Sequence, residues 1–161
     1  MSWRDEIQKI VKGEVRFDEP MSRHTSFNIG GPADCFVIPQ DIEDLKEILF
    51  FSRKRRLPLK VIGRGTNLLV RDRGIKGVVV RLGKGFEGIK FSKRFLLAGA
   101  GMRLSTLIKI AASKGWGGLE FTIGIPGSLG GAIATNAGTE AFSISQRLES
   151  IRVMKIGRAH V

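Results

Sequence analysis

The chain has 161 residues, 42% of them hydrophobic, which suits one ordinary globular domain or two small lobes. Its 21 glycines argue against a helical bundle and favour strands, turns and close backbone approaches. The formal net charge of +12 favours an anionic partner, either nucleic acid or a phosphorylated small molecule. Because the chain has no tyrosine and few aromatics among its basic residues, a base-stacking surface is disfavoured and no nucleic-acid partner is expected.

The cysteine and histidine content bears on compartment and metal. Cys35 is the only cysteine, which excludes an internal disulfide framework and fits a reducing cytoplasm. Two histidines and one thiol have no metal-ligand spacing, so no metal is expected. No uncharged run reaches the length of a membrane span, and the N-terminus is amphipathic rather than signal-like. We therefore expect a cytoplasmic protein with no membrane association.

The first half of the chain alternates predicted helices, loops and strands. Apolar residues at helical spacing predict a short amphipathic helix over 3–12. A polar loop over 21–34 leads into a strand at 35–38. Asp41 is a favourable N-cap for a helix that ends in the basic run at 53–56. Four cations there are more typical of a solvated helix end, matched to the helix dipole, than of a phosphate site.

The second half is richer in predicted strands. A polar region at 84–93 is typical of a hairpin connection between two of them. The other predicted elements are strands at 58–62, 77–82, 95–100 and 148–154, an extended segment at 68–70, and a helix from Leu104 to its end at Gly115.

Two glycine-rich segments stand out, GRGTN at 63–67 and GIPGSLGGAIATNAG at 124–138. Leu68 replaces the third glycine of a Rossmann fingerprint, and the Gly-Lys-Ser/Thr tripeptide of a P-loop does not occur. Each segment is predicted at a strand end, where glycines would leave backbone N–H groups open to an anion such as a pyrophosphate. Taken singly, each segment is more simply explained as a tight turn. Their presence together, in this order, favours the anion site.

Four motifs in order, HTSFNIGGPAD, VIGRGTNLLV, GIPGSLGGA and NAG, resemble the UDP-N-acetylenolpyruvoylglucosamine reductase (MurB) family over about residues 20–155. The resemblance implies an α+β fold of the vanillyl-alcohol-oxidase (PCMH) type, in which two lobes clasp FAD. It also implies that the second lobe is incomplete and the substrate domain absent. The implied division is a lead-in helix at 1–19, lobe 1 at 20–82 and a partial lobe 2 at 83–155, and we interpret 156–161 as a non-native tail from its own sequence.

The resemblance also implies which residues bind the cofactor. Thr139-Glu140-Ala141 stands where the family often has Ala-Tyr-Gly, so the chain departs from the pattern just after its NAG segment. The implied FAD-binding residues are Gly63, Gly65, Thr66, Asn67, Leu68, Ile125, Pro126, Gly127, Ser128, Ala132 and Asn136.

The activity implied by the resemblance is the NADPH-dependent reduction of an enolpyruvyl UDP-sugar to UDP-N-acetylmuramate, with NADPH as hydride donor to FAD. The family's catalytic arginine lies in a Tyr-Arg-x-Ser motif, and no tyrosine occurs here. The proton-donating serine and the glutamate belong to the C-terminal part, so no catalytic residue is assigned. The alternatives are another FAD-linked oxidoreductase of this fold and, in a different class, a basic nucleic-acid-binding module.

His24 and the last six residues admit specific interpretations. His24 precedes the first glycine turn and could face the flavin or a phosphate, or lie at the surface. IGRAHV at 156–161 breaks the apolar alternation before it and matches a translated sequencing adapter, so we interpret it as read-through. His160 within it is expected to be solvated.

Overall fold

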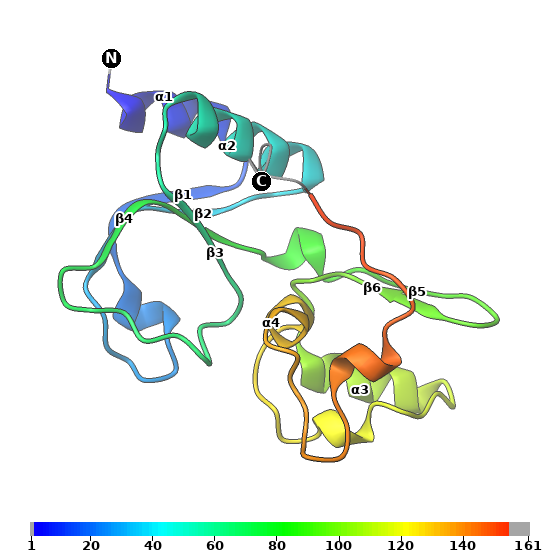
Figure 1. The fold of residues 1–161 in the computed structure, drawn as a ribbon. Coiled ribbons are helices and arrows are strands. Elements are labelled where there is room, and N and C mark those ends of the chain that lie inside the picture. Colours follow the sequence, from blue (N-terminus) through cyan, green and yellow to red (C-terminus); the bar gives the residue numbers. More distant parts are fainter. Residues whose placement is uncertain (1, 155–161) are drawn as a thin grey trace, which may run out of the picture.

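The computed structural model describes residues 2–154, which form an α+β fold (Figure 1). Short 3-10 turns η1 (Met21–His24), η2 (Lys84–Phe86), η3 (Glu120–Thr122) and η4 (Ile144–Arg147) connect the main elements. Those main elements are α1 (Trp3–Ile10), β1 (Glu14–Pro20), β2 (Pro32–Ile38), α2 (Ile42–Lys54), β3 (Leu59–Ile62), β4 (Ile75–Arg81), β5 (Ile89–Phe91), β6 (Leu96–Ala98), α3 (Leu104–Ser113) and α4 (Leu129–Ala134).

The sheet lobe, as we call α1, α2 and β1 to β4, is built on a four-stranded sheet in the order β1-β2-β4-β3. β1 runs antiparallel to β2, and β4 lies parallel to both β2 and β3. The central strands are apolar on both faces because both faces are covered. Val37 and Val80, paired in register, pack under α1 and α2, whereas Phe36 and Val79 pack with Met21 on the opposite face.

Polar groups fix the helices of the sheet lobe. The Asp41 side chain caps α2 by accepting from the backbone N–H groups of Glu43 and Asp44. Asp44 is itself buried, and its carboxylate accepts from the N–H groups of Lys12, Gly13 and Gln40. One carboxylate therefore joins the start of α2 to the turn between α1 and β1.

The helical lobe, as we call α3, α4, β5 and β6, has little sheet. β5 and β6 form a three-residue antiparallel pair. Its core consists of apolar side chains from α3, α4, η4 and the turn before α3: Met102, Leu104, Leu107, Leu129, Ala132 and Ile144. α3 ends before Gly115, whose φ of +74° favours glycine.

Most predicted elements are present, and two are wrong. Residues 68–70 form no strand, because both edges of β4 are already paired and Val70 packs instead against the Met21 and Phe36 cluster. Residues 148–154 also form no strand, and Ile151 and Val153 are exposed, so their alternation has no face to cover.

Three elements were not predicted. β1 lies within the segment expected to be only a lead-in helix, and α4 lies within the second glycine segment. β5 lies within the region 84–93 that was expected to be a hairpin connection, and this expectation is wrong because β6 pairs with β5 and not with β4. The described residues contain no helix long and apolar enough to cross a membrane, and no cluster of three metal-ligating side chains. The tail at 156–161 lies outside the described residues.

Candidate functional site

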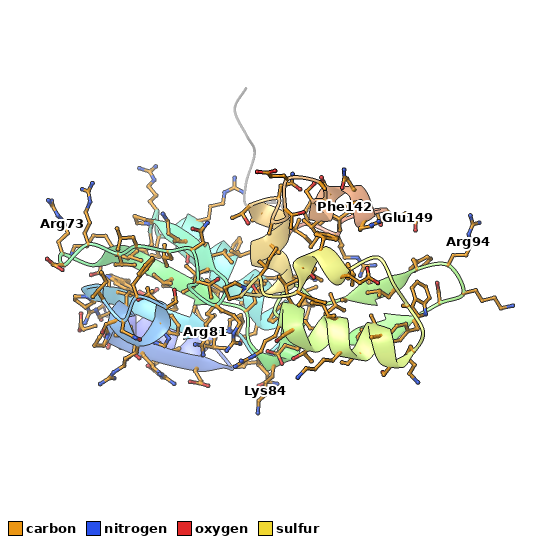
Figure 2. All side chains as sticks on the ribbon, turned by 90° about the horizontal axis from the view of Figure 1, so that it is seen from below. Arg73, Arg81, Lys84, Arg94, Phe142 and Glu149 are labelled. Carbon is orange, nitrogen blue, oxygen red and sulfur yellow. The ribbon has the colours of Figure 1, made fainter. Side chains whose placement is uncertain are left out.

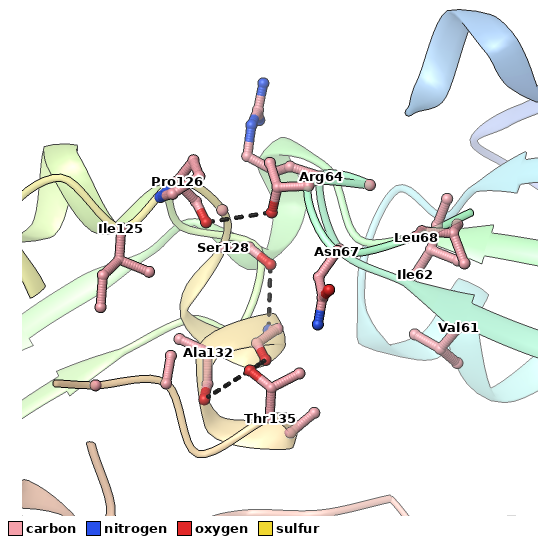
Figure 3. A pocket seen from close by; sticks show the side chains of 18 residues that line it. Val61, Ile62, Arg64, Asn67, Leu68, Ile125, Pro126, Ser128, Ala132 and Thr135 are labelled. Atoms are coloured by element: carbon pink, nitrogen blue, oxygen red, sulfur yellow. Dashed lines mark hydrogen bonds between the residues drawn. The ribbon is translucent and has the colours of Figure 1, made fainter. Parts of the chain in front are cut away.

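A cavity of about 500 Å³ lies where the sheet lobe meets the helical lobe. Figure 3 shows the two segments that line it from opposite sides: the end of β3 with the loop after it, and the turn that leads into α4. These are the two glycine-rich segments singled out in the sequence. The tertiary fold thus brings both segments to one cavity.

The first segment, 63–67, follows the carboxyl end of β3, as predicted. In the described part of the chain, the backbone N–H groups of residues 64–67 meet no hydrogen-bond acceptor. Gly65 has a φ of +68°, and a Cβ there would overlap the carbonyl oxygen of His24. A run of free N–H groups beside a cavity is the arrangement that binds anions.

The second segment was predicted at a strand end, and this is wrong. It follows η3 and turns directly into α4. Ser128 is the N-cap of α4, and its buried hydroxyl accepts from the N–H of Gly131 at 3.3 Å. The small residues after Ser128 lie on the first turns of this short helix, where lack of bulk leaves space for the cavity.

The two segments touch each other directly. The hydroxyl of Thr66 donates to the carbonyl oxygen of Pro126 at 3.2 Å (Figure 3). A Cβ on Gly63 would lie 2.5 Å from Oγ of Ser128, so the Ser128 hydroxyl would have to turn away from its present position. Part of the need for bare backbone therefore comes from packing between the lobes.

Ten of the eleven residues predicted for the cofactor line the cavity. The exception is Asn136, which lies between two lining residues and whose Oδ1 accepts from the N–H of Ser145. The ten are Gly63, Gly65, Thr66, Asn67, Leu68, Ile125, Pro126, Gly127, Ser128 and Ala132.

Further lining residues were missed by the sequence analysis. Each lies within two positions of a predicted residue, and a wider window around each motif would have included them. They are Val61, Ile62, Arg64, Gly131, Ala134, Thr135, Ala137 and Gly138.

The lining of the cavity has a positive electrostatic character. Arg64 is its one charged residue, and no carboxylate lines the described cavity. Burial, followed by the nearby cations Arg103 and Arg81, lowers the pKa of Arg64. A guanidinium surrounded by like charges is stabilised by a bound anion.

His24 is neither at the surface nor against the cavity. It is 8% exposed, and its ring stacks on Phe36 with centroids 4.1 Å apart. Its Nε2 lies 2.9 Å from Oε1 of Glu19, and its Nδ1 lies 3.2 Å from Nη1 of Arg81. Both interpretations of His24 made from the sequence are therefore wrong, because η1 folds its ring into the sheet lobe.

Comparison with protein-family models places this chain among flavin-binding proteins. Residues 33–158 match the model described as FAD binding domain. Because the match covers most of the chain, the chain belongs to this family of FAD-binding domains. The residues present fit such a cofactor, since free N–H groups, glycines and a cation, without carboxylates, line the cavity.

Curated relatives of this chain carry the name of one reductase. UDP-N-acetylenolpyruvoylglucosamine reductase from Desulforamulus reducens is 45% identical over 92% of this chain and 49% of its own length. The enzyme of the same name from Moorella thermoacetica is 41% identical over 97% of this chain and 52% of its own. The resemblance found in the glycine motifs is thus confirmed. The chain spans about half the length of the curated relatives it matches.

Solved structures agree on the fold. MurB from Thermus caldophilus superposes with a TM-score of 0.66 at 34% identity, covering 83% of this chain and 46% of that one. Physcomitrella patens BBE-like 1 superposes with a TM-score of 0.54 at 19% identity, covering 70% of this chain and 26% of that one, and shows the fold alone. The predicted α+β FAD-binding fold is confirmed.

Proposed function

We propose that this chain is the flavin-binding part of a reductase that converts UDP-N-acetylglucosamine enolpyruvate to UDP-N-acetylmuramate in peptidoglycan precursor synthesis. The observation that carries the proposal is the meeting of both glycine segments at one cavity that has free N–H groups and no carboxylate among its described lining. The names of the relatives support the substrate. The cytoplasm would be the place of this reaction.

The cofactor site would be formed by both lobes, which we place at 20–82 and 83–155. The N–H groups of 64–67 would hold the pyrophosphate of FAD, with Thr66 bonded to Pro126 across the two segments and Ser128 capping α4. Asn136 would act from just behind the lining, through the turn that it fixes with Ser145. Bound FAD would supply hydride transfer, from NADPH to the enolpyruvyl double bond of the UDP-sugar.

The first test is flavin retention by the whole chain. After incubation with FAD and removal of free flavin, the purified chain should keep a visible flavin band. Gly63→Ala should weaken retention about tenfold, because its Cβ would displace the Ser128 hydroxyl that caps α4 beside the cavity. Gly88→Ala is the matched control, since a Cβ at Gly88 meets nothing within 4 Å. A folded wild-type chain without retained flavin would contradict the proposal.

The second test concerns the reaction. Because no catalytic residue is assigned in this chain, the flavin band of the loaded chain, once reduced, should not return on addition of UDP-N-acetylglucosamine enolpyruvate. Recovery of the band would show that this chain carries the substrate step by itself and would contradict its proposed role as the flavin-binding part alone. Tight, steeply salt-dependent oligonucleotide binding with no flavin retention would favour the nucleic-acid alternative instead.

A further inference from the structure

The glycine loop at 63–67 is held from behind by the segment that begins with His24. The backbone N–H of Ser26 donates to the carbonyl oxygen of Gly65 at 3.1 Å. The Ser26 hydroxyl donates to the carbonyl oxygen of Thr66 at 3.4 Å. Gly65 packs against the carbonyl of His24 so closely that no Cβ fits. Any shift of His24 would therefore be transmitted to the backbone that lines the cavity.

The ring of His24 is fixed in a polar cluster within the sheet lobe. Glu19 from β1, 6% exposed, meets Nε2, and Arg81 from the end of β4 meets Nδ1. Figure 2 shows Arg81 among the side chains of the sheet lobe, whereas Arg73 and Arg94 project outward at opposite ends of the molecule. Arg16 also contacts Glu19 at 3.2 Å, and Arg23 lies 3.7 Å from it.

This arrangement determines the tautomer of His24. A guanidinium is only a donor, so Nδ1 of His24 must accept from Arg81 and carry no proton. Nε2 must then carry the proton and donate to the carboxylate of Glu19. Burial by itself would raise the pKa of Glu19, but the contacts with His24 and Arg16 together outweigh it and lower the pKa, so this acceptor is ionised at neutral pH.

Arg81 links the cluster to the other side of the same loop. It pairs in register with Ile62, the last residue of β3, directly before Gly63. Its guanidinium also lies over the ring of Phe36, on which His24 stacks. The Arg81 to His24 contact thus ties the start of the loop to the segment that holds its middle.

We propose that His24, as the neutral Nε2–H tautomer held between Glu19 and Arg81, is a positioning residue for the flavin-binding loop, and that its protonation loosens the loop. The proposal rests on the proposed function for its effect on flavin. Nδ1 of His24 accepts from the guanidinium of Arg81, and a proton on Nδ1 would make it a donor. Two donors would then face each other, and the contact would break. The protonated ring keeps its hydrogen bond to Glu19. Its positive charge lies close to the guanidinium groups of Arg81, Arg16 and Arg23 and is repelled by them.

The first experiment needs no flavin. Long-range proton–nitrogen NMR of the chain with labelled histidine reports which ring nitrogen bears the proton, and His24→Gln identifies the signal, since the chain has only two histidines. We expect a single Nε2–H tautomer at about pH 8. The amide signals of Gly65 and Thr66 should shift together with the His24 signal on acidification. An Nδ1–H tautomer, or loop amides indifferent to the ring, would overturn the proposal.

The second experiment compares two substitutions in flavin retention from about pH 8 to about pH 5, the range in which histidine changes charge. His24→Gln keeps a donor for Glu19 and an acceptor for Arg81, so affinity should stay within about twofold of wild type and lose its acid dependence. His24→Leu provides neither group, and should weaken retention about tenfold at pH 8. The flavin affinity of the wild-type chain should weaken as the pH falls.

The outcomes separate this inference from the proposed function. Failure of the wild-type chain to retain flavin overturns the proposed function, while the tautomer and the coupled loop shifts still test the role of His24. Should His24→Gln show the acid dependence of wild type, the inference fails although flavin binding stands. If His24→Leu does not fold, the pH profile of His24→Gln decides.

Discussion

The sheet lobe and the helical lobe meet at one cavity but are stabilised differently. In the sheet lobe, β2 and β4 are hydrogen-bonded on both edges and covered on both faces by apolar clusters. In the helical lobe, a single pair of three-residue strands accompanies one apolar cluster, and Phe95, Leu97 and Phe142 stay about half exposed. A site shared between such lobes has one rigid wall and one wall that depends on a few contacts between helices.

The largest difference should follow from Phe36→Ala in the sheet lobe. Phe36 is fully buried, and its ring supports both Met21 and His24. Losing it should cost about 3–5 kcal/mol in the free energy of unfolding, measured by urea denaturation. Phe50→Ala, at a residue 66% exposed on α2, should change stability by less than about 0.5 kcal/mol. Equal effects would mean that the sheet lobe is not the rigid one.

Next comes Ile144→Ala, which removes a fully buried side chain from the helical lobe. We expect a loss of about 2–4 kcal/mol confined to this lobe. Amide hydrogen exchange should quicken in α3 and α4, while β2 and β4 keep their protection. Ile123→Ala, at a residue 68% exposed, is the control. Loss of protection in both lobes together would show that they unfold as one unit.

A smaller effect is expected from Thr66→Val, which removes the hydrogen bond to Pro126 between the lobes. The cost should be about 1 kcal/mol, with the amide NMR signals of residues 64–68 shifted and the cores of both lobes unchanged. Thr106→Val on α3 serves as control, because the Thr106 hydroxyl makes no hydrogen bond within the described chain. An unchanged 64–68 segment would mean that the lobes are held by apolar packing alone.

The last prediction concerns Glu19, whose contribution to stability is present at neutral pH and disappears in acid. Its folded-state pKa is lowered below the ordinary 4.5, so its contribution to stability is complete above that value and is lost as the pH falls through the lowered pKa. Urea midpoints of wild type should therefore fall in this acid range more steeply than those of Glu19→Gln. Parallel pH profiles would contradict the ion pairs around Glu19.

Local patterns were sufficient for much of the sheet lobe. Asp41 before an apolar helical repeat predicts α2, and valine-rich runs predict β4, because caps and periodicity act over a few residues. The same reasoning failed at 148–154, where alternation is correct but no partner strand lies alongside, and missed β1, whose alternation acquires meaning only beside β2.

The candidate site was predictable in its residues and not in its architecture. Ten of eleven predicted residues line the cavity because the glycine motifs themselves form its walls. That the second motif caps a helix, through Ser128, was not evident, since a run of small residues fits a turn, a crossing or a helix equally well. The buried environment of His24 depends on Glu19 and Arg81, which lie on two different strands.

The sequence by itself determined the family, the flavin motifs and most of the elements. Each of these depends on a short local pattern: a glycine motif, a capping residue or the spacing of apolar residues. Only the tertiary structure decided that Gly63 would contact Ser128, that Thr66 would bond to Pro126, and that His24 would be buried with one tautomer. Such contacts join residues tens of positions apart. Their geometry depends on how β3 and α4 are placed, which no local pattern encodes.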